Sequence, residues 1–177
     1  MNTIIKHCSK QVVKTSLLKA HLRIDNDHEE EYLKEIIEIA TNILEQNIEK
    51  SILKKAYRYI YFGSKLPSSE RITLPLAQVK EVLSVKRLLI DKGKSLPIPY
   101  TTETFNEKTT IITNSSRYPT EIKYVAGITD KEDEIPKDLQ FAILQIAKNI
   151  YECSEESILE SSYVKHVIDS NRTLTIN

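Results

Sequence analysis

Glycine is scarce in this sequence, and its scarcity excludes the common phosphate-binding loops. The 177 residues include three glycines, Gly63, Gly93 and Gly127. Dinucleotide-binding and nucleotide-hydrolysing folds need GxGxxG or GxxxxGKS/T loops, in which closely spaced glycines let the backbone approach phosphate groups. Neither loop can be assembled from glycines so far apart. A glycine-rich or collagen-like chain is excluded for the same reason.

Long apolar runs and paired cysteines are also missing. No stretch approaches the roughly 18 consecutive apolar residues of a membrane span, and the N-terminus lacks the apolar core of a secretory signal. The two cysteines, Cys8 and Cys153, form no CxxC pair, which favours free thiols in a reducing cytosol. We therefore expect no contact with a membrane and no disulfide framework.

Charge of one sign is not in excess, but it is unevenly distributed. The chain has 25 basic and 25 acidic side chains, whereas a free-standing nucleic-acid-binding protein is usually strongly basic. Residues 50–100 carry eleven basic and three acidic groups, a net charge of +8. Residues 129–160 carry nine acidic and three basic groups, a net charge of −6. This segregation is either a coincidence or a means by which copies of the chain attract one another side by side.

Two segments have apolar residues at helical spacing, at about residues 28–48 and 136–152. Their apolar positions are Leu33, Ile36, Ile37, Ala40, Ile43, Leu44 and Ile48 in the first, and Leu139, Ala142, Ile143, Ile146 and Ile150 in the second. Asp27 and Glu30 resemble a capping box before the first helix, and Ser16 is expected to cap a short helix at 17–22. We expect the two long helices to pack together, with Ile37 and Ile143 fully buried.

Between these helices the apolar period changes to two, which is typical of strands. In the clearest case the tyrosines alternate with the other residues from 56 to 62: Tyr57, Tyr59 and Tyr61 would share one face of a strand, and Ala56, Arg58, Ile60 and Phe62 the other. We expect the tyrosines to point outward from a half-buried strand. Asp91-Lys92-Gly93-Lys94 predicts a hairpin turn, and further strands fit 79–90, 109–113 and 120–126. The predicted fold class is therefore α+β, with a small antiparallel insertion at about 52–126 between the two helices.

The last part of the chain turns polar beyond Glu155. Tyr163 to Ile168 and Thr173 to Ile176 alternate around Asp169-Ser170-Asn171, a pattern that predicts a hairpin. Nothing in the same chain requires this appendage. We therefore expect a domain at 1–153 followed by an extended docking tail at 154–177.

No group of residues predicts catalysis. His21, Asp25, Asp27 and His28 fail as a calcium loop, because Glu30 stands where a glycine is needed. They also lack a recognised transition-metal spacing, so capping and a solvated acidic surface explain them better. No serine lies in a GxSxG turn, and Cys153 has no histidine near it in sequence. We therefore expect no catalytic residue, no metal and no cofactor.

Two alternatives stay open at this point. One is a small cytosolic enzyme, such as a hydrolase whose residues meet only in three dimensions. The other is a single-stranded nucleic-acid-binding module that uses the basic segment 50–94. In that module Tyr57, Tyr59 and Tyr61 lie beside Lys54, Lys55 and Arg58, as aromatic and basic side chains do on single-strand-binding surfaces.

Four short motifs, taken in order, resemble a known family. They are LKAHLRID at 18–25, LPLAQVKEV at 74–82, YVAGI at 124–128 and IPKDLQFAIL at 135–144, with the last helix closing on Ile150-Tyr151-Glu152. The order and spacing resemble the head–tail connector (adaptor) proteins of tailed bacteriophages, in the longer version with a β insertion between its helices. The resemblance covers about residues 10–155.

The resemblance implies a structural protein of a virion or a phage-derived particle, without catalysis or cofactor. It implies a ring of about a dozen copies below the portal, which joins head to tail and lets DNA pass without sequence specificity. The implied partners are other copies, the portal protein and the next head-completion or tail protein. The implied location is the head–tail junction of the virion, and the host cytoplasm before assembly.

The candidate contact residues follow from the charge pattern and from the tail. For the subunit interface they are Lys54, Lys55 and Arg58 on the basic side, and Glu132, Asp133 and Glu134 on the acidic side. For docking to the portal they are Tyr163, Val164, Val167 and Ile168 in the tail.

Overall fold

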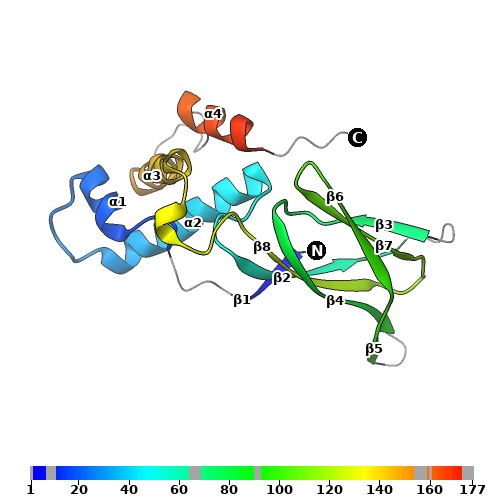
Figure 1. Cartoon of the computed structure of the whole chain (residues 1–177). Coiled ribbons are helices and arrows are strands. Elements are labelled where there is room, and N and C mark those ends of the chain that lie inside the picture. The colour runs from blue at the N-terminus through cyan, green and yellow to red at the C-terminus, as the bar shows by residue number, and fades with distance from the viewer. Residues whose placement is uncertain are drawn as a thin grey trace. The chain divides into compact units, whose positions relative to one another are not determined.

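The chain divides into a helical unit and a strand unit. The computed structural model describes residues 2–6, 11–63, 69–89, 93–153, 159 and 161–172, with backbone alone at 2–6. The described residues of Ser9–Leu53 and Thr129–Arg172 form the helical unit, and those of Lys54–Ile128 form the strand unit together with the first strand. Helices and antiparallel sheets are both present, so the α+β prediction is confirmed (Figure 1).

The helical unit is organised around the two long helices predicted from the sequence. Its elements are α1 (Thr15–Leu22), α2 (Glu30–Ile48), the 3-10 turn η2 (Glu132–Glu134), α3 (Lys137–Tyr151) and α4 (Ser162–Asn171). Helix α2 packs against α3 and also contacts α1 and α4. Ile37 and Ile143 are 2% and 0% exposed, as their spacing predicts. The helical periodicity therefore identified the core of this unit correctly.

The predicted N-terminal caps are wrong. Helix α1 begins at Thr15, one residue before the expected cap Ser16, and α2 begins at Glu30 with no side-chain cap. Asp27 instead forms an ion pair with Lys19, which lowers the pKa of the Asp27 carboxyl, chiefly through a hydrogen bond from the ammonium group. Helix α2 has Glu29 at its N-cap position, so Asp27 lies too far before the helix to cap it as predicted.

The predicted hairpin at the C-terminal end is also wrong where the structure describes it. Residues Ser162–Asn171 form helix α4, and Thr173 to Ile176 lie outside the described residues. Val164 and Val167 are buried, and they are three residues apart. That spacing is compatible with one face of a helix, while the apolar residues from Tyr163 to Ile168 are also compatible with the alternation of a strand. A run this short does not distinguish the two periods, and packing of α4 against α3 and α2 selects the helix.

The strand unit contains two antiparallel sheets. The strands are β1 (Asn2–Lys6), β2 (Lys55–Tyr61), β3 (Ser69–Thr73), β4 (Val79–Leu89), β5 (Lys94–Pro97), β6 (Tyr100–Phe105), β7 (Lys108–Asn114) and β8 (Thr120–Ala126). One sheet has the order β1-β2-β8-β4-β5 and the other β3-β7-β6. Strands β4 and β5 are antiparallel neighbours, as predicted from the turn around Gly93, whose φ is +58°; Asp91 and Lys92 lie outside the described residues.

The tyrosines of β2 point into the core, which corrects the expected outward orientation. Tyr57 is 4% exposed and stacks on Tyr124 of β8, with 5.6 Å between the ring centroids. Tyr59 and Tyr61 pack against the same core, and burial raises the pKa of the Tyr59 hydroxyl. Alternation separates the two faces of a strand but does not identify the buried one. Here Arg58 occupies the other face.

A buried ion pair joins strands from the two sheets. The Glu70 carboxylate on β3 lies 3.6 Å from the Arg87 guanidinium on β4, and both side chains are less than 10% exposed. Arg87 also donates hydrogen bonds to the Thr120 hydroxyl and to the backbone carbonyls of Asn114 and Tyr118. A Cβ atom at Gly63 would lie 2.6 Å from the Ser116 carbonyl oxygen and 2.8 Å from Glu70 Oε1, so a larger residue there would have to displace the backbone beside the ion pair.

Ile37→Asp is expected to unfold the helical unit. An unpaired carboxylate buried between α2 and α3 costs several kcal/mol, which is comparable to a domain's whole stability of about 5–15 kcal/mol. Ile39→Asp is the matched control, since Ile39 lies on the same helix and is 49% exposed. Thermal unfolding followed by circular dichroism distinguishes them. An Ile37→Asp protein that melts with the parent contradicts the assigned helix face.

Glu70→Gln is expected to destabilise the strand unit by about 3–5 kcal/mol, because it leaves the Arg87 charge buried without its carboxylate. The same change at Glu103 is the control. Glu103 pairs with Arg71, and both side chains are more than half exposed, so that pair contributes about 0–1 kcal/mol. Urea unfolding of the two variants measures the difference. Equal losses of stability would show that the buried pair is no more important than the exposed one.

Candidate functional site

The basic interface candidates lie at and before the start of β2, in the strand unit. Lys54 precedes the strand, Lys55 is its first residue, and all three side chains are partly exposed. The Arg58 guanidinium forms an ion pair with Glu121 on the neighbouring strand β8. The positive charge of Arg58, one of the three predicted interface residues, is therefore balanced within the chain.

The acidic interface candidates form the single turn η2, in the helical unit. Glu134 pairs with Lys131 at 2.7 Å and accepts a hydrogen bond from the Thr129 hydroxyl at 2.9 Å. These two donors hold the pKa of the Glu134 carboxyl below its usual range. Asp133 is exposed and Glu132 is partly exposed. The three acids therefore differ in how much charge they offer to a partner.

The four tail candidates do not form one exposed surface. Val164 and Val167 are 0% and 2% exposed and belong to the core of the helical unit. Ile168 is partly buried, and Tyr163 is 37% exposed with its ring against Phe141 at 5.0 Å. The two valines therefore hold α4 on its own unit, and only Tyr163 among the four offers much surface.

The histidines and aspartates near α1 do not converge. The His21 ring meets the ring of Phe141 edge-on at 5.9 Å, and Asp27 is paired with Lys19. Within the described ranges no three metal-ligating side chains gather at one point. Cys153 is exposed after the last turn of α3, and Cys8 lies outside the described residues. No helix in the described part of the chain has the length and apolarity of a membrane span.

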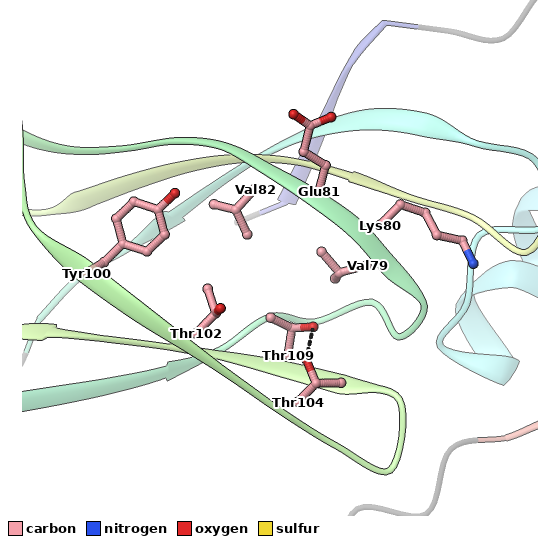
Figure 2. Close-up of a pocket in the computed structure, with 8 residues that line it drawn as sticks. All are labelled: Val79, Lys80, Glu81, Val82, Tyr100, Thr102, Thr104 and Thr109. Carbon is pink, nitrogen blue, oxygen red and sulfur yellow. Dashed lines mark hydrogen bonds between the residues drawn. The ribbon is translucent and has the colours of Figure 1, made fainter.

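A shallow groove opens between β4 and the β6–β7 hairpin of the strand unit, with a volume of about 290 Å³. Figure 2 shows the ring of Tyr100 directed toward Val82, and the hydroxyls of Thr104 and Thr109 joined by a hydrogen bond of 3.3 Å. Glu81 points away from the threonines. The groove therefore presents hydroxyl and apolar groups, without a nucleophile beside a base.

The inward tyrosines bear on the nucleic-acid alternative. A single-strand-binding surface needs exposed aromatic rings beside basic groups. Tyr57, Tyr59 and Tyr61 pack in the core of the strand unit, whereas Arg58 lies on the opposite face of β2. The strand therefore separates Arg58 from the three tyrosines, whereas Lys55, the first residue of β2, is on the same face as they are.

Comparisons with known proteins agree with this picture. Residues 16–88 match a protein family described as "Phage gp6-like head-tail connector protein". No curated protein sequence matches the chain.

Solved structures share the fold over the whole chain. A chain of the "Neck of empty GTA particle computed with C6 symmetry" is similar with a TM-score of 0.78 and 17% identity, and a chain of the "Virion of native gene transfer agent (GTA) particle" with 0.75 and 18%. A chain of the "Neck of native GTA particle computed with C12 symmetry" gives 0.68 and 17%. Each match covers 100% of this chain and 97% of the other. The resemblance indicated by the sequence is therefore confirmed: the chain is similar to phage head–tail connector proteins over residues 16–88, and it has the fold of chains from the gene-transfer-agent neck.

Proposed function

We propose that this protein is a structural head–tail connector of a tailed phage or a phage-derived particle. The observation that carries the proposal is the family match, which spans α1, α2 and strands β2 to β4, combined with the whole-chain fold of the neck structures. Those structures are described with C6 and C12 symmetry. The proposed assembly is accordingly a ring of identical copies at the head–tail junction of the virion.

The ring is proposed to lie between the portal protein and the next head-completion or tail protein, with DNA passing through its channel. This role depends on surfaces and not on catalysis. It fits a chain whose catalytic candidates are spread apart: His21 packs on Phe141, and Asp27 pairs with Lys19. The role also fits the balanced net charge, since a channel that passes any sequence needs no strongly basic reading surface.

The residues after Cys153 remain our proposed docking segment for the portal. In this proposal, Val164 and Val167 pack α4 against the helical unit. Because both valines are buried there, they do not contact the portal themselves. Tyr163 and Ile168 retain partial exposure on α4.

Rings are expected to form when the purified protein is concentrated, and to weaken as salt is added. Exposed charges are screened over about 8 Å at physiological ionic strength, so a contact between the basic and acidic candidates is salt-sensitive. Changing Lys54, Lys55 and Arg58 to Glu is expected to block rings, and reversing Glu132, Asp133 and Glu134 to Lys is expected to restore them partly. Negative-stain electron microscopy measures both effects.

The assembly experiment has a clear negative outcome. Rings that are unchanged from low to high salt and that survive the triple reversal would eliminate these two charged clusters as the contact. Circular dichroism of the triple variant is the control, because Arg58 also balances Glu121 within the fold. A variant that has lost its fold does not test the interface.

Metal removal is expected to change nothing. A connector needs no metal, so a chelator should leave the melting temperature of the protein unaltered and nuclease and phosphatase assays should show no turnover. His21→Ala and Asp27→Ala serve as the informative variants. Reproducible turnover that disappears in either variant would replace the connector with the enzyme alternative.

A further inference from the structure

One side of the helical unit carries apolar and acidic side chains together. On α2, Tyr32 and Ile39 are each 49% exposed, one two turns after the other. Glu35 and Glu38 lie beside them, are exposed, and take part in no ion pair among the described residues. By contrast, Glu30 and Glu31 are balanced by Lys34. We name Tyr32, Glu35, Glu38 and Ile39 the acidic stripe.

Another side of the same unit carries apolar and basic side chains. Leu17 of α1, Phe141 of α3 and Tyr163 of α4 are 46%, 41% and 37% exposed. The ring of Phe141 contacts those of Tyr163 and His21, and Leu17 lies one turn before His21 on α1. Lys14, which immediately precedes α1, and Lys137, the first residue of α3, are exposed and form no ion pair within the described part of the chain. We name Lys14, Leu17, Lys137, Phe141 and Tyr163 the basic patch.

Ile39 of the stripe and Phe141 of the patch lie on opposite sides of the α2–α3 layer, whereas the ring of Tyr32 reaches that of Tyr151 on α3 at 6.3 Å. Ile37 of α2 and Ile143 of α3 lie on the buried faces of their helices, and the two helices pack together. Two residues along a helix correspond to a rotation of about 200°, so Ile39 and Phe141 point away from that shared interface in opposite directions. Both surfaces belong to one unit, and their separation is therefore fixed by the packing of α2 against α3.

We propose that the acidic stripe of one copy docks onto the basic patch of the next copy in the ring. The inference rests on the proposed connector function and adds a second pair of surfaces to its subunit contact, beside the charged clusters of Lys54, Lys55 and Arg58 and of Glu132, Asp133 and Glu134. A ring repeats one head-to-tail contact, so each subunit needs two different surfaces that complement each other. The stripe and the patch meet this requirement in charge, in apolar content and in the opposite placement of Ile39 and Phe141. Exposed aromatic anchors such as Phe141 are the side chains that most often dominate such contacts.

Complementary charge reversals test the contact. The stripe variant carries Glu35→Lys and Glu38→Lys, and the patch variant carries Lys14→Glu and Lys137→Glu. Each variant alone presents like charges at every contact, which is expected to raise the concentration for half-maximal ring assembly at least about tenfold. Mixed in equal amounts, the two variants are expected to assemble again, because stripe and patch attract whenever the copies alternate around an even-numbered ring.

A third chain carrying all four reversals has a basic stripe and an acidic patch, and it is expected to form rings alone. Assembly of either double variant at the parent concentration overturns the proposal. So does failure of both the mixture and the four-fold variant, because the two surfaces then do not meet. Sedimentation velocity gives the assembled fraction, and circular dichroism confirms that each variant is folded.

Two phenylalanines provide the apolar control. Phe141→Ala is expected to weaken assembly, whereas Phe105→Ala, at the tip of the β6–β7 hairpin where Phe105 is 71% exposed, is expected to leave it unchanged. Equal effects of the two changes contradict the patch. Failure of the connector function itself is seen separately, since the parent chain then forms no ring at high concentration or when mixed with portal protein.

Discussion

The packing of α2 against α3 is the interaction on which the helical unit depends. The two helices pack together although the whole strand insertion separates them in sequence. Helices α1 and α4 also contact this pair, and α4 contributes the buried side chains of Val164 and Val167 to the core. The same packing determines which side chains remain outside. A surface that assembles with other copies is thus specified by the residues that do not face the core.

In the strand unit, two small sheets pack around a core that contains several tyrosines. Tyr57 and Tyr124 are buried in this core and stack on each other, and the Glu70–Arg87 ion pair links the two sheets. A buried ion pair gains little net stability over apolar residues of the same size. Its value here lies in register, since Arg87 reaches Thr120 and two backbone carbonyls only in one alignment of the strands.

The sequence predicts those features whose cause is local. Leu33 to Ile48 and Leu139 to Ile150 repeat at helical spacing, and α2 and α3 follow. The alternation at 56–62 predicts β2 but not its buried face, because the choice depends on the sheet that packs above it. Arg87 reads as a surface residue until Glu70 is brought beside it from another strand. The basic patch could not be predicted from the sequence, because its apolar residues come one each from α1, α3 and α4 and meet only in the folded unit.

The insertion begins and ends at neighbouring points of the fold. Lys55 at the start of β2 is paired with Ala126 at the end of β8, and the Thr129 amide donates to the Ile52 carbonyl where the chain re-enters the helical unit. Its two ends are therefore held together at each unit, whatever lies between them. An insertion of this kind can change in length or sequence without changing the distance between the end of α2 and the start of α3. The strand unit is in this sense free to diversify, while the helices keep one geometry.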